Sequence, residues 1–403
     1  MVDHGGPGPV VTGTASNSKV FFLLIKSFIG TGVLFLPSAF RDGGLAFSFT
    51  FLIFISYLSV RGMLLLAKVN RIVPGSFGDI AAALYGEPAR YLVLSSISIS
   101  QLGFCTAYMV FIAQNVMGFV KQIYGDDAAS GVGVGTLIAL QAALYTPLAL
   151  VRKIKSFAVL SLIGDAFILG GLVVISAAAF GIIHERGGVA EDIVQFNKET
   201  FALYIGTAVY TFEGVGLVIP IAQSMAQPQD FGKVLSFTMT LTTLVYLFIA
   251  SLGYLAWGNS VNTIVLLNLP VSPVSQTVYV LYMIAIVFTW PLVLFPAARI
   301  LEQGVLPHAS GKHSQLHKWQ KNGLRSALVT GIALGAFVGA DKLNKLVAVI
   351  GSFACIPLSF LYPSLLHIKA FPDQSKIGRA ADLGMLAFGL VAMAYVTTMM
   401  FVL

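Results

Sequence analysis

The sequence predicts an all-α polytopic membrane protein with eleven transmembrane helices, ten of which form a five-plus-five inverted repeat with broken helices 1 and 6. Three observations support this prediction. Of the 403 residues, 57% are hydrophobic and only 10% are charged, against about 25% charged in a soluble protein. Eleven apolar runs are long enough to cross a bilayer. Two of these runs, half a chain apart, contain a Gly-x-Gly followed by a proline.

The composition excludes several classes of protein. So few charges cannot cover the surface of a water-soluble fold, which excludes soluble enzymes, nucleic-acid binders and disordered proteins. The net charge of +7 is therefore a signal of membrane topology. Cys105 and Cys355 lie inside apolar runs, where we expect free thiols that pack as small apolar residues. We expect no metal site and no cofactor, because the histidines and cysteines show no metal-binding spacing.

The spans follow the chain in order, each containing about 20 mainly apolar residues. They are 19–41, 44–67, 89–120, 132–150, 156–183, 200–225, 232–256, 273–302, 323–340, 344–367 and 380–402. They predict a disordered cytosolic tail (1–18), a first five-helix repeat (19–183), a second, inverted five-helix repeat (200–367) and an eleventh helix (380–402). The tail lacks the apolar segment of a signal peptide.

Lysine and arginine in the loops set the orientation. With a cytosolic N-terminus, 16 of these residues fall on the cytosolic side and 6 on the other side. The asymmetry favours a cytosolic N-terminus and, with eleven spans, a C-terminus on the lumenal side. Arg61, near the cytosolic end of the second span, is expected to extend its charged head to the interface.

Two spans are predicted to break near the middle of the bilayer. The first holds Gly30-Thr31-Gly32 and the sixth holds Gly214-Val215-Gly216, each followed by a proline. Backbone groups freed by a break must line a cavity enclosed by protein, and this pattern is typical of inverted-repeat transporters. Half-helix N-termini attract a carboxylate and freed carbonyls attract an ammonium group, so an amino acid zwitterion suits both. The alternative is that glycine and proline only kink these helices.

Three ionisable side chains lie well inside spans: Lys26, Asp165 and Glu213. An intramembrane charge is a functional candidate by default. Glu213 lies in the break of the sixth span and is the leading candidate for a proton carrier; alternatively, it hydrogen-bonds backbone of the first span. Lys26 and Asp165 could pair between packed helices, whereas a lysine extending to the interface and a structural aspartate are the alternatives.

Polar residues on two other spans are further candidates. The third span carries Ser98, Gln101, Cys105 and Tyr108 on one helical face. This face would either line a cavity, with Tyr108 at the substrate and Gln101 as polar support, or join helices through hydrogen bonds. Thr289, two residues before a proline in the eighth span, would either ligate an ion or satisfy freed backbone.

The sequence also resembles a known family. Residues 24–37 resemble the first-helix motif of the amino acid/auxin permease family, and residues 212–216 resemble its sixth-helix motif. The tenth helix of the fungal vacuolar amino acid exporters is similar to residues 351–357 and 366–370. The same exporters are also similar to this chain at residues 100–104 in the third span. The resemblance covers nearly the whole chain after residue 18.

The resemblance implies a leucine-transporter-type fold in the vacuolar membrane and proton-coupled export of mainly neutral amino acids from the lumen to the cytosol. It implies that the backbone at Gly30, Thr31 and Gly32 meets the substrate carboxylate, and that the Phe212–Glu213 segment meets the amino group. Gly214 should admit the ligand backbone beside them. Leu23 stands where animal proton-coupled members carry a histidine, which leaves Glu213, Asp165 and Lys26 as the proton-coupling candidates.

Other functions are weighed against this one. A sodium-coupled or uncoupled amino acid permease and a transporter-like amino acid receptor are the main alternatives. A channel needs a continuous pore lining. The two-fold inverted repeat of the spans argues against a channel. An enzyme is not expected, because the chain shows no nucleophile–base or metal set. The expected partners are an amino acid, a proton and the lipid bilayer, with no nucleic acid and with the oligomeric state open.

Overall fold

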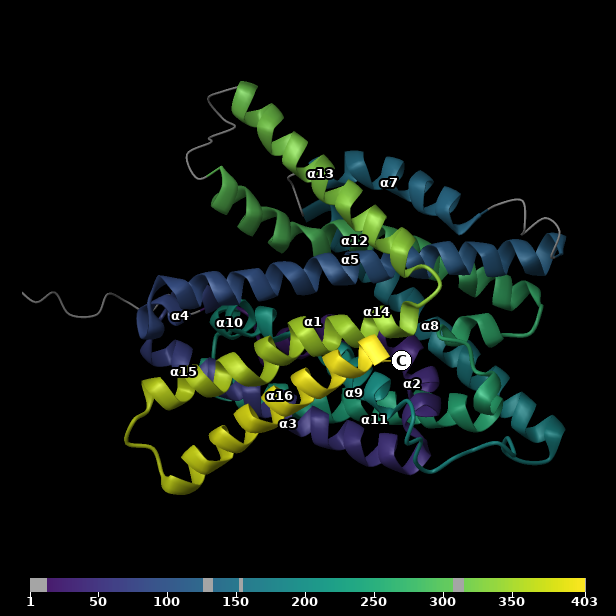
Figure 1. Cartoon of the computed structure of the whole chain (residues 1–403), viewed down its shortest axis with the longest axis horizontal. Helices are drawn as coiled ribbons and strands as arrows, with labels where there is room; N and C mark the ends of the chain where they lie inside the picture. Colours follow the sequence, from purple (N-terminus) through teal and green to yellow (C-terminus); the bar gives the residue numbers. More distant parts are fainter. Residues whose placement is uncertain (1–12, 126–132, 152–154, 307–314, 403) are drawn as a thin grey trace, which may run out of the picture.

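The computed structural model describes residues 13–125, 133–151, 155–306 and 315–402, without the side chains of residues 155–162 and 401. Regular structure in these ranges is helical, apart from one parallel bridge between Ala15 and Met225. The helices run mostly along the long axis of the molecule (Figure 1).

The first five predicted spans correspond to α1 (Asn17–Phe28) with η1 (Thr31–Phe35) and α2 (Leu36–Gly43), then α3 (Leu45–Ile72), α5 (Glu87–Tyr124), α7 (Val134–Leu150) and α8 (Lys155–Arg186). The remaining six correspond to α9 (Phe201–Thr211) with α10 (Val215–Ser224), then α11 (Phe231–Trp257), α12 (Pro273–Val305), α13 (Gln315–Gly339), α14 to α15 (Leu343–Ala370) and α16 (Lys376–Val402). A short helix, α4 (Phe77–Tyr85), lies between the second and third spans, and the single turns η2 (Pro228–Asp230), η3 (Gly258–Ser260) and η4 (Val265–Asn268) flank α11.

The number of spans is only partly settled by helix length and composition. Within the described residues, eight helices are long and apolar enough to cross a membrane, and the pair Asn17–Phe28 and Thr31–Gly43, bent by 41°, would make a ninth. Helix α7 is apolar but has only 17 residues, and α13 is not among the eight. The predicted total of eleven therefore depends on α7 and α13.

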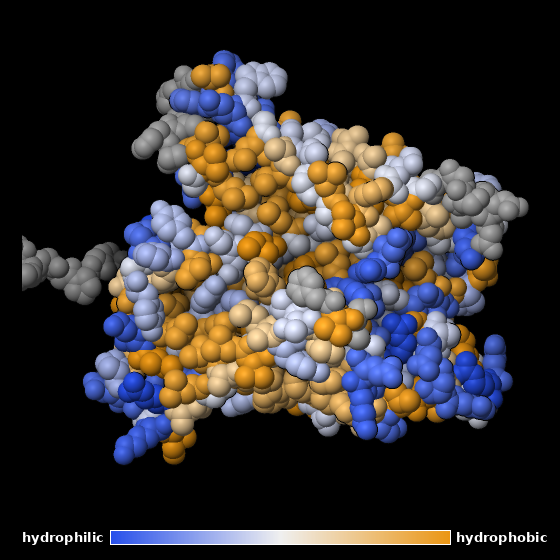
Figure 2. All heavy atoms as spheres, in the orientation of Figure 1, coloured by the Kyte–Doolittle hydropathy of each residue, from blue (hydrophilic) through white to orange (hydrophobic). Residues whose placement is uncertain are grey.

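Helix packing places α9 at the centre of the bundle. Every residue of α9 after Phe201 is buried, because α2, α14, η5 (Gly351–Cys355) and α16 all pack against it. Helices α7 and α13 lie together on one side of the bundle, and α3, α15 (Tyr362–Ala370) and α16 lie on the opposite side (Figure 1). Apolar residues fill the middle of the outer face, and hydrophilic residues gather toward its ends (Figure 2), as expected for a protein surrounded by lipid.

Glycines bring the sixth and tenth spans into backbone contact. A Cβ atom added at Gly206 would lie 2.3 Å from the carbonyl oxygen of Ala348, and one at Gly351 would lie 1.9 Å from the carbonyl oxygen of Gly206. Any larger side chain at these positions would push α9 and η5 apart. The tenth span is π-helical at η5 and at η6 (Pro357–Leu361), a conformation that frequently marks functional sites.

The residues before α1 form hydrogen bonds with the end of the sixth span. The backbone N–H of Ala15 donates to the carbonyl of Ser224, and its carbonyl accepts from the N–H of Ala226, both at 2.9 Å. The side chain of Asn17 donates to Asp230 at 3.1 Å. Within the predicted disordered tail, Ala15 is thus paired and Asn17 and Ser18 are helical, whereas residues 1–12 lie outside the described part of the chain.

Two ion-pair networks join the helices at positions where sequence reasoning expected solvated charges. The sequence predicts that Arg61 extends its charged head to the interface. In the structure, its guanidinium pairs instead with the fully buried Asp382 of α16 at 2.5 Å. The other carboxylate oxygen of Asp382 lies 2.7 Å from Nδ1 of His367 on α15. Arg325 of α13, one of the 16 lysine and arginine residues assigned to the cytosolic side, is buried and pairs with Glu302 of α12 at 2.6 Å.

Candidate functional site

The first span is interrupted between Phe28 and Thr31. Ile29 and Gly30 leave helical geometry (φ/ψ of −77°/92° and −128°/−152°), and a 3₁₀ helix follows. The N–H groups of Gly30, Thr31 and Gly32 precede its first internal hydrogen bond, so they have no helical acceptor. A Cβ atom added at Gly30 would meet nothing within 4 Å. The break therefore combines unpaired backbone donors with open space.

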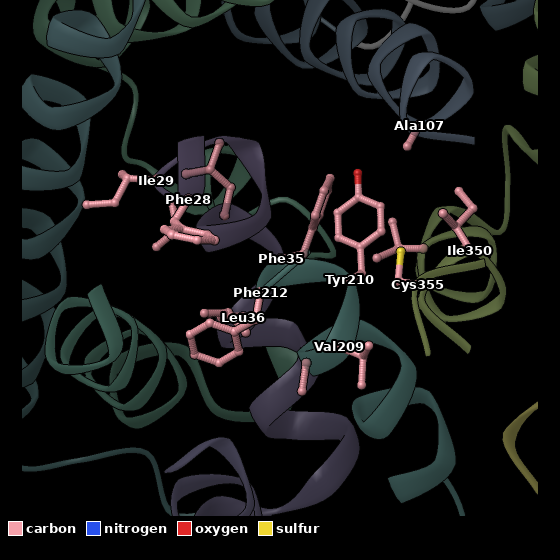
Figure 3. Close-up of a cluster of buried hydrophobic side chains, with 14 of the residues drawn as sticks. Phe28, Ile29, Phe35, Leu36, Ala107, Val209, Tyr210, Phe212, Ile350 and Cys355 are labelled. Atoms are coloured by element: carbon pink, nitrogen blue, oxygen red, sulfur yellow. The ribbon is translucent and has the colours of Figure 1, made fainter. Parts of the chain in front are cut away.

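The sixth span is interrupted between Thr211 and Val215. Its break lies directly against the first one: a Cβ atom at Gly214 would lie 2.6 Å from the ring of Phe28, and one at Gly32 would lie 3.2 Å from Cγ2 of Thr211. Figure 3 shows Phe28 and Ile29 on one segment facing Phe212 on the other. The structure thus brings together the two Gly-x-Gly segments that the sequence singled out, 181 or more residues apart.

Glu213 lies inside the second break. Phe212 and Gly214 on either side of it are buried, whereas Glu213 keeps an intermediate exposure. Its carboxylate is within electrostatic range of Tyr108 on α5 and of Cys355 on η5. A carboxylate at this position lies close to unpaired backbone and is able to meet a cationic group or to accept a proton.

Tyr108 connects the third span to the first break. Its hydroxyl forms a hydrogen bond with the side chain of Thr31. Cys105, one turn earlier on α5, donates to the carbonyl of Trp290 at 3.9 Å, and the indole N–H of Trp290 donates to the carbonyl of Cys105 at 3.1 Å. The polar face of α5 therefore contacts the first break through Tyr108 and α12 through Cys105.

Lys26 and Asp165 form the ion pair that the sequence offered as one alternative. Nζ of Lys26 lies 3.4 Å from Oδ2 of Asp165, and the side chains are 27% and 20% exposed. Asp165 is also within electrostatic range of Tyr108. The Lys26–Asp165 ion pair therefore belongs, with Tyr108 and Glu213, to one electrostatic cluster around the two breaks.

Two predicted supporting residues have less connection to this cluster. The hydroxyl of Thr289 donates to the carbonyl of Ala285 at 2.8 Å, on its own helix. Gln101 is half-buried on α5, nearly two turns before Tyr108. Among the described residues, no group of three or more His, Cys, Asp or Glu side chains could hold a metal ion.

Sequence reasoning missed Tyr210. This side chain of α9 is 5% exposed, and its ring lies edge-on to Phe104 at 4.7 Å and to Phe35 at 6.2 Å between centroids. Its electrostatic neighbours include Tyr108, Cys355 and Glu213. Its position three residues before Glu213, directly before the predicted break, was the available signal.

Comparisons with known proteins identify the family of the chain. Residues 13–402 match the family model described as "Transmembrane amino acid transporter protein". The chain is 41% identical to "Vacuolar amino acid transporter 3" of Schizosaccharomyces pombe, over 99% of this chain and 60% of that protein. It is 41% identical to "Vacuolar amino acid transporter 3" of Saccharomyces cerevisiae, over 94% of this chain and 56% of that protein. The chain thus spans less than two thirds of the length of these fungal relatives. Its identity to "Amino acid transporter AVT3B" of Arabidopsis thaliana is 30%, over 94% of this chain and 91% of that protein.

Solved structures confirm the transporter fold expected from the resemblance. One is MhsT in complex with L-phenylalanine (TM-score 0.62, 13% identity, 96% of this chain and 99% of that chain). Another is the inward-facing conformation of Mhp1 (TM-score 0.63, 12% identity, 100% of this chain and 94% of that chain). At such low identity, these structures show the fold alone.

The relatives are named as transporters and not as enzymes, in agreement with the sequence. With the family match along almost its whole length, the chain belongs to the transmembrane amino acid transporter proteins.

Proposed function

We propose that the chain is a proton-coupled transporter that exports mainly neutral amino acids from the vacuole lumen to the cytosol. One observation supports this most directly: two helix breaks lie against each other and combine open space at Gly30 with the partly buried residue Glu213. The names of the vacuolar relatives support the location and the amino acid substrate. The proposal includes eleven spans, two inverted five-helix repeats, a cytosolic N-terminus and a lumenal C-terminus.

The substrate would bind between the breaks. The unpaired N–H groups of Gly30, Thr31 and Gly32 would receive its carboxylate, since helix N-termini favour anions. The Phe212–Glu213 segment would receive its ammonium group, and the small Gly214 would leave room for the ligand backbone. Tyr108, held by Thr31, would border the site from α5.

Glu213 would also carry the proton. On the acidic lumenal side the carboxyl group would be protonated, and the amino acid would bind beside the neutral group. On the neutral cytosolic side the group would lose its proton, which disfavours rebinding in the reverse direction. Each pH unit across the membrane supplies about 1.4 kcal/mol per proton, so a gradient of one to two units would drive about ten- to hundredfold accumulation. Asp165 with Lys26 is the second candidate for coupling, because this pair belongs to the same cluster.

Transport by purified protein in proteoliposomes tests the proposal. Uptake of a panel of amino acids would be measured with and without a pH gradient, and with and without sodium. We expect uptake that a pH gradient accelerates and sodium does not. Glu213→Gln, which mimics the protonated form, should still exchange amino acids but lose the acceleration. Asp165→Asn should be milder; if it alone abolishes pH-driven uptake, the coupling carboxylate is Asp165. Acceleration by sodium without a pH gradient would establish the sodium-coupled alternative.

A further inference from the structure

The hydroxyl of Tyr210 is buried without a hydrogen-bond partner in the described part of the chain. Leaving a buried hydroxyl unsatisfied is unfavourable, and native structures rarely do so without a functional reason. Tyr204, on the same helix, shows the usual arrangement: its buried hydroxyl donates to the carbonyl of Ser48 at 2.5 Å. Tyr210 is therefore a donor that the surrounding protein does not use.

The position of Tyr210 directs this donor to the helix breaks. Edge-on contacts with Phe35 and Phe104 hold the ring, and the hydroxyl points from α9 toward α5, where Ala107 lies (Figure 3). Tyr108 and Glu213 are both within its electrostatic range. The N–H of Glu213 donates to the carbonyl of Tyr210 at 3.3 Å, so a tight backbone turn at the end of α9 links the two residues.

We infer that the Tyr210 hydroxyl donates a hydrogen bond to the carboxylate of the bound amino acid, and so makes that carboxylate a requirement for binding. The inference rests on the proposed function. Glu213 would meet the ammonium group, and an α-amino acid carries ammonium and carboxylate on neighbouring carbons. A donor at the end of α9, three residues before Glu213, is therefore suited to the carboxylate end. A hydroxyl bonds most strongly to an ionised acceptor, which distinguishes this contact from one to a neutral side chain.

The test compares Tyr210→Phe with Tyr204→Phe, the same chemical change on the same helix. Binding of L-alanine, L-serine and L-alaninamide would be measured by calorimetry on the purified protein, and the melting temperature would be measured without ligand. We expect Tyr210→Phe to weaken binding of alanine and serine equally, by about tenfold to hundredfold, as for loss of a hydrogen bond to a charged group. Alaninamide lacks the carboxylate, so its weaker affinity should not change. The melting temperature without ligand should not fall, because no protein hydrogen bond is lost.

Tyr204→Phe should show the opposite pattern, with a lower melting temperature and unchanged affinities. Three results would overturn the inference: wild-type affinity for alanine in Tyr210→Phe, a loss confined to serine, or a lower melting temperature with unchanged affinity. The first shows no contact, the second a contact to the ligand side chain, and the third a structural hydrogen bond. If the wild-type protein binds none of the twenty amino acids, the proposed function itself fails, which is a separate and recognisable result.

Discussion

Asp382 is fully buried and its carboxylate accepts a hydrogen bond from Arg61 at 2.5 Å. The second oxygen lies 2.7 Å from His367. Arg61 belongs to α3, in the first proposed repeat, and His367 belongs to α15, in the second. The eleventh helix, which is part of neither repeat, is therefore joined to both through one carboxylate.

Asp382→Asn should destabilise the protein strongly, because it leaves the charge of Arg61 without its partner in a buried site. Breaking a buried pair from one side costs about 3–5 kcal/mol. The melting temperature of purified protein in detergent would measure the loss. Asp373→Asn, at an exposed position in the preceding loop, is the matched control and should have almost no effect. An equal response of the two variants would show that the buried network contributes little.

Gly30→Ala should impair transport without impairing folding. A Cβ atom at Gly30 meets nothing within 4 Å, so the protein alone accommodates it, whereas a ligand in that space would not. We expect at least a tenfold loss of amino acid affinity with an unchanged melting temperature. Gly216→Ala adds the same methyl group to α10, where it also meets nothing within 4 Å, and should transport normally. Normal transport by Gly30→Ala would mean that the first span is only kinked.

Lys26 and Asp165 should show energetic coupling. Each single neutralisation, Lys26→Met or Asp165→Asn, removes one partner of the 3.4 Å pair and leaves a charge inside the membrane. The double variant should therefore be more stable than the sum of the single changes predicts, by about 0.5–3 kcal/mol. Melting temperatures of the three variants form the cycle. Additive losses would indicate that both side chains are satisfied by solvent.

The topology predicts opposite labelling of two exposed positions, Glu191 between α8 and α9 and Lys376 at the start of α16. In sealed vesicles, a membrane-impermeant maleimide should label Glu191→Cys only from the lumenal side and Lys376→Cys only from the cytosolic side. The native Cys105 and Cys355 are buried and give little background. Labelling of both positions from one side would contradict five spans between them.

Helix α4 should be sensitive to acid through its capping box. Ser76 and Asp79 cap each other, and these hydrogen bonds hold the pKa of Asp79 below its ordinary 3.8. A folded-state pKa below the unfolded value stabilises the helix above about pH 4 and loses that contribution as the pH falls through the folded-state pKa. The difference in melting temperature between wild type and Asp79→Ala should therefore be full at pH 7 and shrink toward pH 3. A constant difference would point to packing of the side chain instead.

Sequence reasoning identified the features that arise from local chemistry. Glycine pairs predicted interruptions of the first and sixth spans, where α1 ends at Phe28 and α9 ends at Thr211. The cost of intramembrane charge singled out Lys26, Asp165 and Glu213 as candidates. It could not identify Arg61 and Asp382 as partners, because 321 residues separate them and only tertiary packing brings them together. It also missed Tyr210, since a tyrosine in a membrane helix is unremarkable until its hydroxyl is seen to have no protein acceptor.

The bridge between Ala15 and Met225 has a consequence for folding. During synthesis, residues 13–16 emerge before the first described span, α1, but their acceptor and donor at Ser224 and Ala226 emerge more than 200 residues later. Such a contact has a high loop-closure cost and forms late. Its formation therefore requires the sixth span to be inserted and docked beside the first. Protection of the Ala15 amide from hydrogen exchange would report completed assembly of the two broken spans.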